Sequence, residues 1–290
     1  MPAFRYVVCD VFTERPLQGN QLAVFTDARA IPEHLLQPLA REIDFSETVY
    51  VLPAEGDGHA RIRIFTPARE LPFAGHPTLG SAFVLAAPLQ LEEIRLETGA
   101  GVVPVRLERD GDRIVFGRME QPVPSIEPYE REAELLAAVG AARAELPVEL
   151  YDNGVRHVFV CLDSPDEVGA LQPDLARLAV LEPDAGVNCF AGSGRAWKTR
   201  MFWPGSGVDE DPASGSAAGP LALHLARHGR TAFGEEIEIS QGAEVGRPST
   251  LYGRVDGSAE RIERVEVGGA AVIVARGEFR LGTGETRFPP

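Results

Sequence analysis

Hydrophobic residues recur along the chain with two different periods, and the periods alternate. Period-two runs such as FRYVVCDVF, QLAVF, SETVYVL and ARIRIFTP predict strands in the first part of the chain, and Gly19-Asn20 predicts a turn between the first two of them. Among them, residues 32 to about 42 place Leu35, Leu36 and Leu39 on one helical face, and Pro32 suits a helix start. Strands continue over EIRLETGAGVVPVRLERDGDRIVFGRM, so this part is predicted to be rich in sheet.

The order of predicted elements repeats in the second part of the chain. The proline-rich segment QPVPSIEP has no period, which predicts a domain boundary near residues 120–128. A helix over about 129–142 precedes a strand, an Asn-Gly turn and another strand in PVELYDNGVRHVFVCLDS. Strands return over about 249–282, and the tail TGETRFPP is predicted to be frayed.

One segment occurs in two copies. Residues 63–86 read RIFTPARELPFAGHPTLGSAFVLA, and residues 200–226 read RMFWPGSGVDEDPASGSAAGPLALHLA. With three extra residues in the second copy, the matched pairs include Arg63 with Arg200, Phe65 with Phe202, Glu70 with Glu210, and Gly75 with Gly215. One long-period repeat predicts two related domains, because a solenoid needs at least three short units.

Each copy leads from a strand through a glycine turn into an apolar helix. Pro77 follows Gly75 closely, at a position where a helix start tolerates proline. Both helices are apolar on most faces, which predicts central positions. Two helix starts that face one cleft would hold a carboxylate with their free backbone N–H groups. Either copy alone is more often an ordinary turn, but the duplication, with His76 matched to Ser216, favours a binding site.

Composition and charge exclude several classes of protein. The chain has 290 residues, 44% of them hydrophobic and 24% charged, which is typical of a globular protein with two domains. A formal charge of −15 argues against nucleic acid and anionic membrane as partners. The sequence has neither a signal peptide pattern nor an apolar run of membrane-spanning length, so a cytoplasmic location is expected.

The cysteines and histidines give no metal or redox motif. Cys9, Cys161 and Cys189 match no zinc or disulfide spacing, and an odd number of cysteines fits a reducing compartment. The six histidines are scattered and are interpreted as having no pair at metal-ligand spacing, so no metal is predicted. The Gly-Ser-Gly at residues 192–194 lacks the rest of a dinucleotide fingerprint.

Glu47 is the strongest candidate for chemistry. It precedes the apolar run VYVL, and an acid at the edge of such a run is expected to have a raised pKa, as a general acid or base needs. Most glutamates of this kind are simply solvated, and Asp211 and Glu210 also have bland interpretations as a helix cap and a solvated neighbour. His76 is read as a cap or a hydrogen-bond partner, and His157 as a structural or rim residue.

The chain resembles the phenazine-biosynthesis isomerase (PhzF) family. The likeness covers nearly the whole chain, through GNQLAVF, FSETVYV, RIFTPARELPFAGHPTLG, YDNGVRHVFV, NCFAGSGRAW and EDPASGSAAGPLALHLARHG. It implies an α/β (α+β) fold of the diaminopimelate epimerase type. Two pseudo-twofold-related domains would each wrap a barrel-like sheet round a central helix, with the active site between them. The expected domains are residues 1–122, completed by a strand at about 270–283, and residues 123–269.

The resemblance also implies a reaction and a set of site residues. The reaction is the isomerisation of trans-2,3-dihydro-3-hydroxyanthranilate to an aminoketone, in which a proton moves from C3 to C1 without a cofactor. Glu47 would carry the proton, and the polar groups of a cyclic amino acid substrate would be bound by His76, Asp211, Ser216 and the backbone amides of Gly75 and Gly215. A homodimer is expected from the resemblance alone.

Two other functions remain open. Related epimerases use two cysteines, one at each helix start, but here those places hold Ala74 and Ser214. An isomerase or epimerase of another cyclic or amino-acid substrate is one alternative. A non-catalytic ligand-binding protein on the same fold is the other, and it predicts an expendable Glu47. The sequence does not decide whether Trp203 lines the pocket or fills the core.

Overall fold

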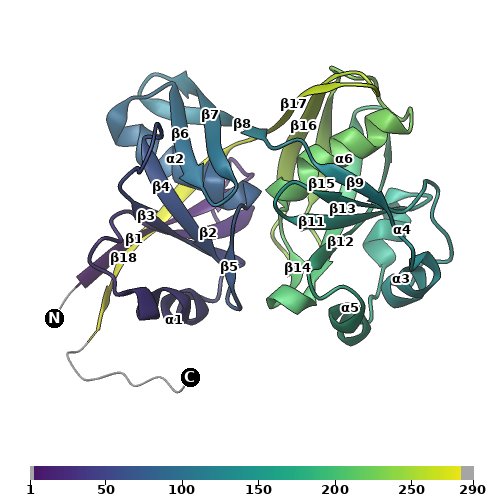
Figure 1. Ribbon diagram of the computed structural model, residues 1–290, viewed down its shortest axis with the longest axis horizontal. Coiled ribbons are helices and arrows are strands. Elements are labelled where there is room, and N and C mark those ends of the chain that lie inside the picture. Colours follow the sequence, from purple (N-terminus) through teal and green to yellow (C-terminus); the bar gives the residue numbers. More distant parts are fainter. Residues whose placement is uncertain (1–2, 282–290) are drawn as a thin grey trace.

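In the computed structural model, which describes residues 3–281, eighteen strands form one hydrogen-bonded sheet that winds into two halves (Figure 1). Here the first half is residues 3–121 with the last strand, and the second half is residues 125–269. The strands of the first half are β1 (Ala3–Val11), β2 (Asn20–Phe25), β3 (Glu47–Leu52), β4 (Ala60–Phe65), β5 (Glu70–Leu71), β6 (Glu93–Thr98), β7 (Gly101–Asp110), β8 (Arg113–Gln121) and β18 (Ala271–Arg280). Its helices are α1 (Glu33–Ile43) and α2 (Gly75–Leu89).

The second half contains the remaining elements. Its strands are β9 (Ser125–Pro128), β10 (Glu149–Asp152), β11 (Arg156–Cys161), β12 (Ala185–Ser193), β13 (Ala196–Trp203), β14 (Val208–Asp211), β15 (Glu236–Gln241), β16 (Ser249–Gly257) and β17 (Ile262–Gly269). Its helices are α3 (Glu132–Val139), α4 (Pro165–Ala170), α5 (Leu175–Leu181), the 3-10 turn η1 (Pro204–Ser206) and α6 (Gly215–Arg227). The predicted frayed tail lies outside the described residues.

The two halves have the same strand pairing. In the first half β1–β2 is antiparallel, β2–β3 parallel, β3–β4 antiparallel and β4–β6 parallel. The second half repeats this series with β10, β11, β12, β13 and β15. The halves are linked by the antiparallel pair β8–β17, and the chain then returns to the first half, where β18 pairs with β1. The fold is therefore the two-part α/β architecture that the duplicated segment predicts.

A matched ion pair supports the duplicated segment in each half. Arg63 donates to both carboxylate oxygens of Glu70 at 2.7 Å, and Arg200 donates to both of Glu210 at 2.8 and 2.7 Å. Two parallel hydrogen bonds of this kind fix the relative geometry of the two groups. Each arginine therefore joins the strand before the loop to the short strand after it. Glu210 is thus paired, contrary to its interpretation as a solvated residue.

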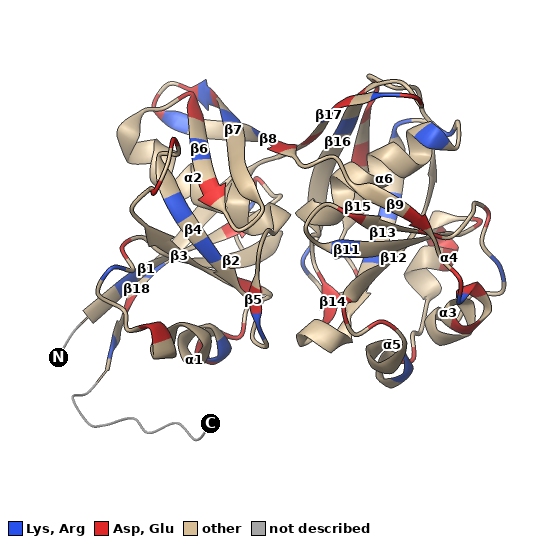
Figure 2. Cartoon of the chain, viewed as in Figure 1, with Lys and Arg blue, Asp and Glu red and all other residues tan. Residues whose placement is uncertain are grey.

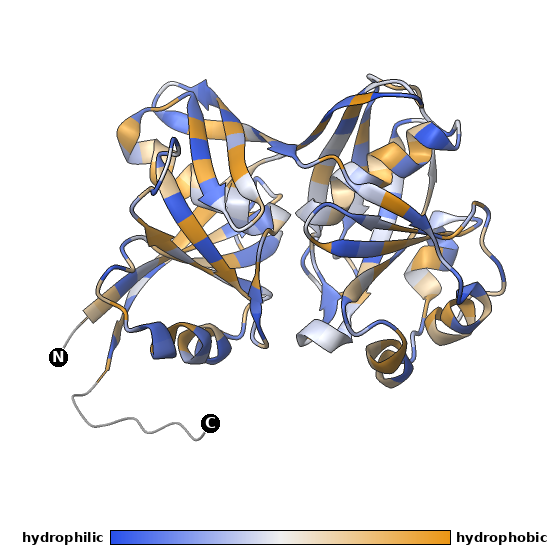
Figure 3. Ribbon diagram, viewed as in Figure 1, coloured by the Kyte–Doolittle hydropathy of each residue, from blue (hydrophilic) through white to orange (hydrophobic). Residues whose placement is uncertain are grey.

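A buried helix lies inside each half. Helix α2 packs against β1, β2 and β8, while α6 packs against β16 and β17, and the two helices contact each other. Figure 3 shows long apolar stretches on both helices, as their sequences predict. Twelve consecutive residues of α6, from Gly215 to Ala226, are buried, so this helix has no solvated face over most of its length.

Several local predictions need correction. The proline-rich segment QPVPSIEP, which has no period in the sequence, contains β9. This strand pairs with β10, so its backbone groups find hydrogen-bond partners despite the prolines nearby. The helix expected over about 129–142 is shorter, since Gly140 ends it in a left-handed conformation with φ of 82°. Helices α4 and α5 were not predicted, because each has too few residues to show a helical period in the sequence. Asn20, read as part of a turn, begins β2. The domain boundary at 122/123 stays a prediction.

The starts of α2 and α6 touch through their glycines. A Cβ atom on Gly75 would lie 2.3 Å from the carbonyl carbon of Gly215 and 2.3 Å from the backbone nitrogen of Ser216. One on Gly215 would lie 2.8 Å from the backbone nitrogen of His76. Backbone atoms cannot rotate away as a flexible side chain can, so the two helix starts meet only without side chains at these positions.

Gly75→Ala is therefore expected to destabilise the protein by about 3 kcal/mol or more, beyond the usual cost of overpacking. Gly169→Ala, in α4, is the matched control, because the nearest atom to its new Cβ is 3.4 Å away in a flexible glutamate. The control should be neutral or slightly stabilising. Urea unfolding of both variants measures the difference. Equal midpoints for the two variants would contradict the close helix contact.

Candidate active site

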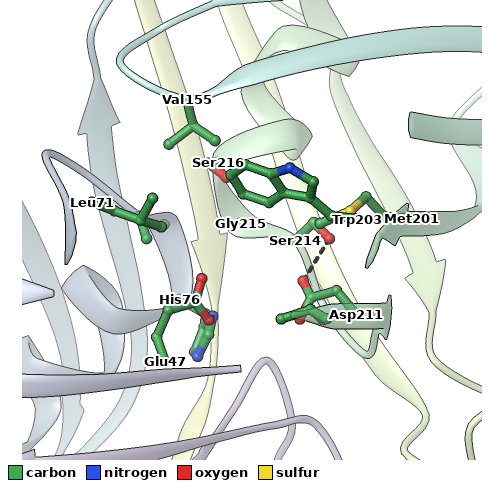
Figure 4. A pocket seen from close by; sticks show the side chains of 13 residues that line it. Glu47, Leu71, His76, Val155, Met201, Trp203, Asp211, Ser214, Gly215 and Ser216 are labelled. Atoms are coloured by element: carbon green, nitrogen blue, oxygen red, sulfur yellow. Dashed lines mark hydrogen bonds and ion pairs between the residues drawn. The ribbon is translucent and has the colours of Figure 1, made fainter. Parts of the chain in front are cut away.

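A small cavity lies between the two halves, where α2 and α6 begin (Figure 4). Its volume is about 10 Å³, room for about one water molecule. In Figure 4, Glu47, Leu71 and His76 of the first half lie on one side, and Met201, Trp203 and Asp211 of the second half lie opposite them. The lining residues are Glu47, Leu71, Ala74, Gly75, His76, Val155, Met201, Trp203, Val208, Asp211, Ser214, Gly215 and Ser216.

Glu47 reaches this cavity from the first residue of β3. Helix α1 ends at Asp44 in a left-handed conformation with φ of 57°, and the chain then turns into the strand. The Glu47 side chain is 12% exposed, and its Oε2 lies 3.4 Å from Nδ1 of His76, long for a hydrogen bond. Burial, followed by the negative charge of Asp211, raises the pKa of Glu47 well above its ordinary value.

Asp211 lies at the end of β14, on the side of the cavity that belongs to the second half. Its Oδ1 accepts a hydrogen bond of 2.7 Å from Nδ2 of Asn20, and its Oδ2 accepts one of 2.6 Å from the Ser214 hydroxyl. These donors favour the carboxylate, but burial has the larger effect and raises the pKa of Asp211. Asn20 belongs to the first half, so this contact joins the two halves directly.

The matched residues His76 and Ser216 both face the cavity. His76 is buried, and burial lowers its pKa to about 3, so its ring is neutral at physiological pH. The Oγ of Ser216 lies 3.0 Å from Nε2 of His157. The structure therefore brings Glu47, His76, Asp211 and Ser216 together. His157 is fully buried, so its interpretation as a rim residue is wrong.

Neither helix start is closed by a side-chain cap at its N-cap residue, Ala74 for α2 and Ser214 for α6. Both N-caps line the cavity at the places where a two-cysteine epimerase would carry its thiols. The three cysteines are buried, and none of them is among the residues that line the cavity. Burial raises the pKa of Cys161 to about 11 and that of Cys189 to about 12, which makes these thiols poor nucleophiles.

Trp203 both lines the cavity and contacts the other half. The Arg69 guanidinium lies 5.4 Å from the centre of the Trp203 ring and forms an ion pair of 2.7 Å with Asp184. Arg69 follows β4 in the first half, whereas its two partners belong to the second, so the contact bridges the halves beside the site. The Trp203 Nε1 is buried without a hydrogen-bond partner among the described residues.

Sequence reasoning missed the residues that support the site from behind. Asn153 donates 2.9 Å to the backbone oxygen of Ser216, and Gln121 donates 2.8 Å to that of Gly215. Asn20 was available in the quoted run GNQLAVF, and Asn153 in YDNGVRHVFV, but each was read as a turn residue. Amides are common in turns, so composition alone does not separate the two roles.

One histidine pair does lie at metal-ligand spacing, contrary to expectation. His224 and His228 are four residues apart, and their ring nitrogens converge on Oε2 of Glu149 at 3.2 and 3.0 Å. The same oxygen accepts 2.7 Å from Arg227 and 2.9 Å from Tyr151. A cation here would have to displace the Arg227 guanidinium, so these residues do not fit an open metal site. The hydrogen bonds and ion pairs of Glu149 instead join the C-terminal end of α6 to β10.

Charged residues are spread over both halves of the chain. Figure 2 shows acidic and basic residues interspersed over both halves, with the acidic ones in excess in the sequence. Among the described residues, no helix has both the length and the apolar character needed to cross a membrane.

The family of phenazine biosynthesis-like proteins (PhzC-PhzF) matches residues 9–277 of the chain. The chain belongs to this family. One relative, from Pseudomonas aeruginosa, is named trans-2,3-dihydro-3-hydroxyanthranilate isomerase; it is 52% identical over 277 residues, which cover 96% of this chain and 99% of the relative. The resemblance drawn from the sequence motifs is thus confirmed, and this PhzF family member aligns with its relative over nearly its whole length.

Solved structures confirm the fold of this family member. A PhzF family protein from Bacillus anthracis superposes with a TM-score of 0.85 at 24% identity, covering 97% of this chain and all of that one. A probable proline racemase from Agrobacterium radiobacter gives a TM-score of 0.67 at 13% identity, with 98% and 94% of the two chains covered. The two-part barrel-and-helix architecture is therefore shared with racemases as well as with PhzF proteins.

Glu47→Gln is expected to make the folded protein more stable at neutral pH. The folded-state pKa of Glu47 is raised, so the protonated form of this side chain favours the folded protein. That stabilisation is complete below the unfolded pKa of about 4.5 and is lost as pH rises toward the folded pKa. Glutamine does not titrate, so its advantage should grow above pH 4.5, by about 1.4 kcal/mol for each unit of pKa elevation. Urea unfolding from pH 4.5 to 8 measures it, and a constant difference would contradict the shift.

Proposed function

We propose that the protein is a trans-2,3-dihydro-3-hydroxyanthranilate isomerase of phenazine biosynthesis. The observation that carries the proposal is the position of Glu47, a buried carboxyl group with a raised pKa in a cavity between two helix starts. A relative with that name is 52% identical over nearly the whole chain. A small zwitterionic ring with a carboxylate is the kind of ligand that paired helix starts can hold against the overall negative charge of the protein.

Glu47 is proposed to move the proton. Its carboxylate takes the proton from C3 of the ring, and the electron pair of the broken C–H bond enters the ring double bonds. The shifted electron pair then takes the proton from the Glu47 carboxyl group at C1, and the enol formed at C3 becomes a ketone when its O–H proton is lost and a proton adds to C4. No atom is gained or lost, so the reaction needs no redox partner. Burial makes the Glu47 carboxylate a stronger base than one in water, which suits removal of a proton from carbon.

The other predicted residues are proposed to bind the substrate. The free amides at Gly75 and Gly215 would receive the substrate carboxylate, because the first amides of a helix have no partner within it. His76, Asp211 and Ser216 would contact the amino and hydroxyl groups and stabilise the charge that develops as the C–H bond breaks. His76 is neutral because of its burial, so it can act as a hydrogen-bond donor or acceptor without adding a full charge.

The size of the cavity requires movement before a substrate ring can bind. A volume of about 10 Å³ is far below the roughly 300 Å³ of a typical ligand pocket. Trp203 or the halves themselves must therefore move, and the contact of Arg69 with Asp184 must open if the halves separate. Four further parts of the proposal rest on the sequence alone. They are the homodimer, the cytoplasmic location, the absence of a cofactor, and the domain limits of residues 1–122 with about 270–283 and residues 123–269.

Glu47→Gln is expected to abolish turnover while leaving the fold intact, because the amide has nearly the same shape but cannot cycle a proton. Purified protein and trans-2,3-dihydro-3-hydroxyanthranilate are mixed in D₂O and followed by NMR. The wild type should consume the substrate, with deuterium at C1 if the Glu47 proton exchanges with solvent. A wild type that leaves the substrate unchanged would refute the proposed activity, and an active variant would remove Glu47 from the mechanism.

Asp211→Asn should move the acid side of the pH profile to lower pH. The base must be ionised, so kcat/KM falls below the pKa of Glu47, and part of the elevation of that pKa comes from the Asp211 charge. Removing this charge lowers the pKa of Glu47, although burial, the larger cause, keeps it above the ordinary value. The profile of kcat/KM from pH 4.5 to 9 tests this. An unmoved acid limb in an active variant would show that the two carboxyl groups do not interact.

A further inference from the structure

The place equivalent to Glu47 in the second half is held by Gly186. Thr48 pairs with Phe65 across β3 and β4, and Val187 pairs with Phe202 across β12 and β13. Since Phe65 and Phe202 are matched in the duplicated segment, Thr48 corresponds to Val187. The residue before each of these, Glu47 or Gly186, therefore occupies the equivalent position.

His157, together with Met201, occupies the space beside Gly186. It pairs with Gly186 across β11 and β12, as Leu22 pairs with Glu47 across β2 and β3. A Cβ atom on Gly186 would lie 3.0 Å from Sδ of Met201 and 3.2 Å from Nδ1 of His157. The polar side chain beside the helix start is thus supplied by β3 in the first half and by β11 in the second. Each contacts the matched residue of its own helix, with Glu47 near His76 and His157 on Ser216.

Asn188 determines which nitrogen of His157 carries the proton. The Asn188 Nδ2 lies 3.1 Å from the backbone oxygen of Gly186 and 3.4 Å from that of Val158, so the amide nitrogen, not the oxygen, must face this side. The same Nδ2 lies 3.3 Å from Nδ1 of His157. The two amide hydrogens are shared among these three acceptors, and an amide nitrogen cannot accept a hydrogen bond from an Nδ1–H group, so Nδ1 faces it as an unprotonated acceptor. In a neutral ring the proton is then on Nε2, and burial keeps the ring neutral by lowering its pKa to about 3.

The direction of these hydrogen bonds controls the Ser216 hydroxyl. Because Nε2–H of His157 donates, Ser216 Oγ must accept at that contact and its own hydrogen points elsewhere. Ser216 lines the cavity, which is where a ligand oxygen would receive this hydrogen. Without His157, the hydroxyl of a serine in the first turn of a helix is free to turn and bond to nearby backbone carbonyls instead.

We propose that His157, held by Asn188, is a positioning residue that presents the Ser216 hydroxyl as a hydrogen-bond donor to an oxygen of the substrate. The role in turnover rests on the proposed function, whereas the tautomer of His157 does not. His157 neither takes nor gives a proton during the reaction, which separates it from Glu47.

The kinetic test compares two substitutions of His157 with the loss of the hydroxyl itself. His157→Leu places in β11 the residue that β2 carries at the equivalent position, and it cannot donate a hydrogen bond. His157→Gln keeps an N–H donor of similar reach. We expect His157→Leu to lower kcat/KM by about 10-fold, as for a lost hydrogen bond between uncharged groups, and His157→Gln to recover most of that loss.

A double variant and a pH profile separate positioning from other roles. Ser216→Ala should lower the same kinetic parameter, and adding His157→Leu to it should change kcat/KM by less than about twofold. Losses that multiply in the double variant would overturn the proposal, as would a His157→Gln variant no better than His157→Leu. The pH profile of His157→Leu should keep the wild-type shape. A lost limb would make His157 an acid or base in the reaction, which also overturns the proposal.

The tautomer is measured independently of any activity. Histidine labelled with ¹⁵N is followed by long-range ¹H–¹⁵N NMR in the wild type, with His157→Gln used to assign the signal. An unprotonated Nδ1 and a protonated Nε2 between pH 5 and 8 are expected. The reverse tautomer, or a cationic ring, would overturn the proposal even if the isomerase activity is confirmed. If the wild type proves inactive on the proposed substrate, the expected tautomer still supports the orientation of Ser216, so the two failures are distinguishable.

Discussion

The contact between the starts of α2 and α6 is the constraint on which the site depends. Gly75 and Gly215 bring the two backbones so close that no side chain fits between them. Because each helix is buried inside its own half, this contact also places the two halves relative to one another. Glu47 and Asp211 belong to different halves, and they face a common cavity only because the helix starts meet. The arrangement of the candidate site therefore follows from a packing requirement of the backbone.

The two halves share the ion pairs and strand pairings that support the site, but they differ in the side chains beside the helix starts. The bidentate pairs Arg63–Glu70 and Arg200–Glu210 are the same in both halves, as are the strand pairings around them. The side chains on the strands beside the helix starts differ, because β3 supplies the Glu47 carboxyl group and β11 supplies the His157 imidazole. A symmetric pair of bases suits chemistry on two faces of a carbon. Under the proposed function, the asymmetric pair leaves Glu47 as the one proton carrier, which suits a transfer between two carbons of one ring.

The sequence predicted the parts of the structure that a local pattern can encode. The repeat of residues 63–86, the apolar helices and the gathering of Glu47, His76, Asp211 and Ser216 could all be expected from motifs and resemblance. The role of Asn20 could not, because its partners Asp211 and His76 are distant in sequence and an asparagine beside a glycine looks like a turn. His157 was discounted for a similar reason, since nothing in the run RHVFV shows that the opposite residue on β12 is a glycine.

Burial acts in opposite directions on the two kinds of titratable group in this site. It raises the pKa of Glu47, which makes the carboxylate a better base, and it lowers the pKa of His76 and His157, which keeps both rings neutral. A neutral imidazole has one donor and one acceptor, so a single fixed neighbour determines the direction of its next hydrogen bond. Charged histidines would instead attract the Glu47 carboxylate and weaken it as a base. The same buried environment thus favours a basic carboxylate and fixes the direction of the hydrogen bonds beside it.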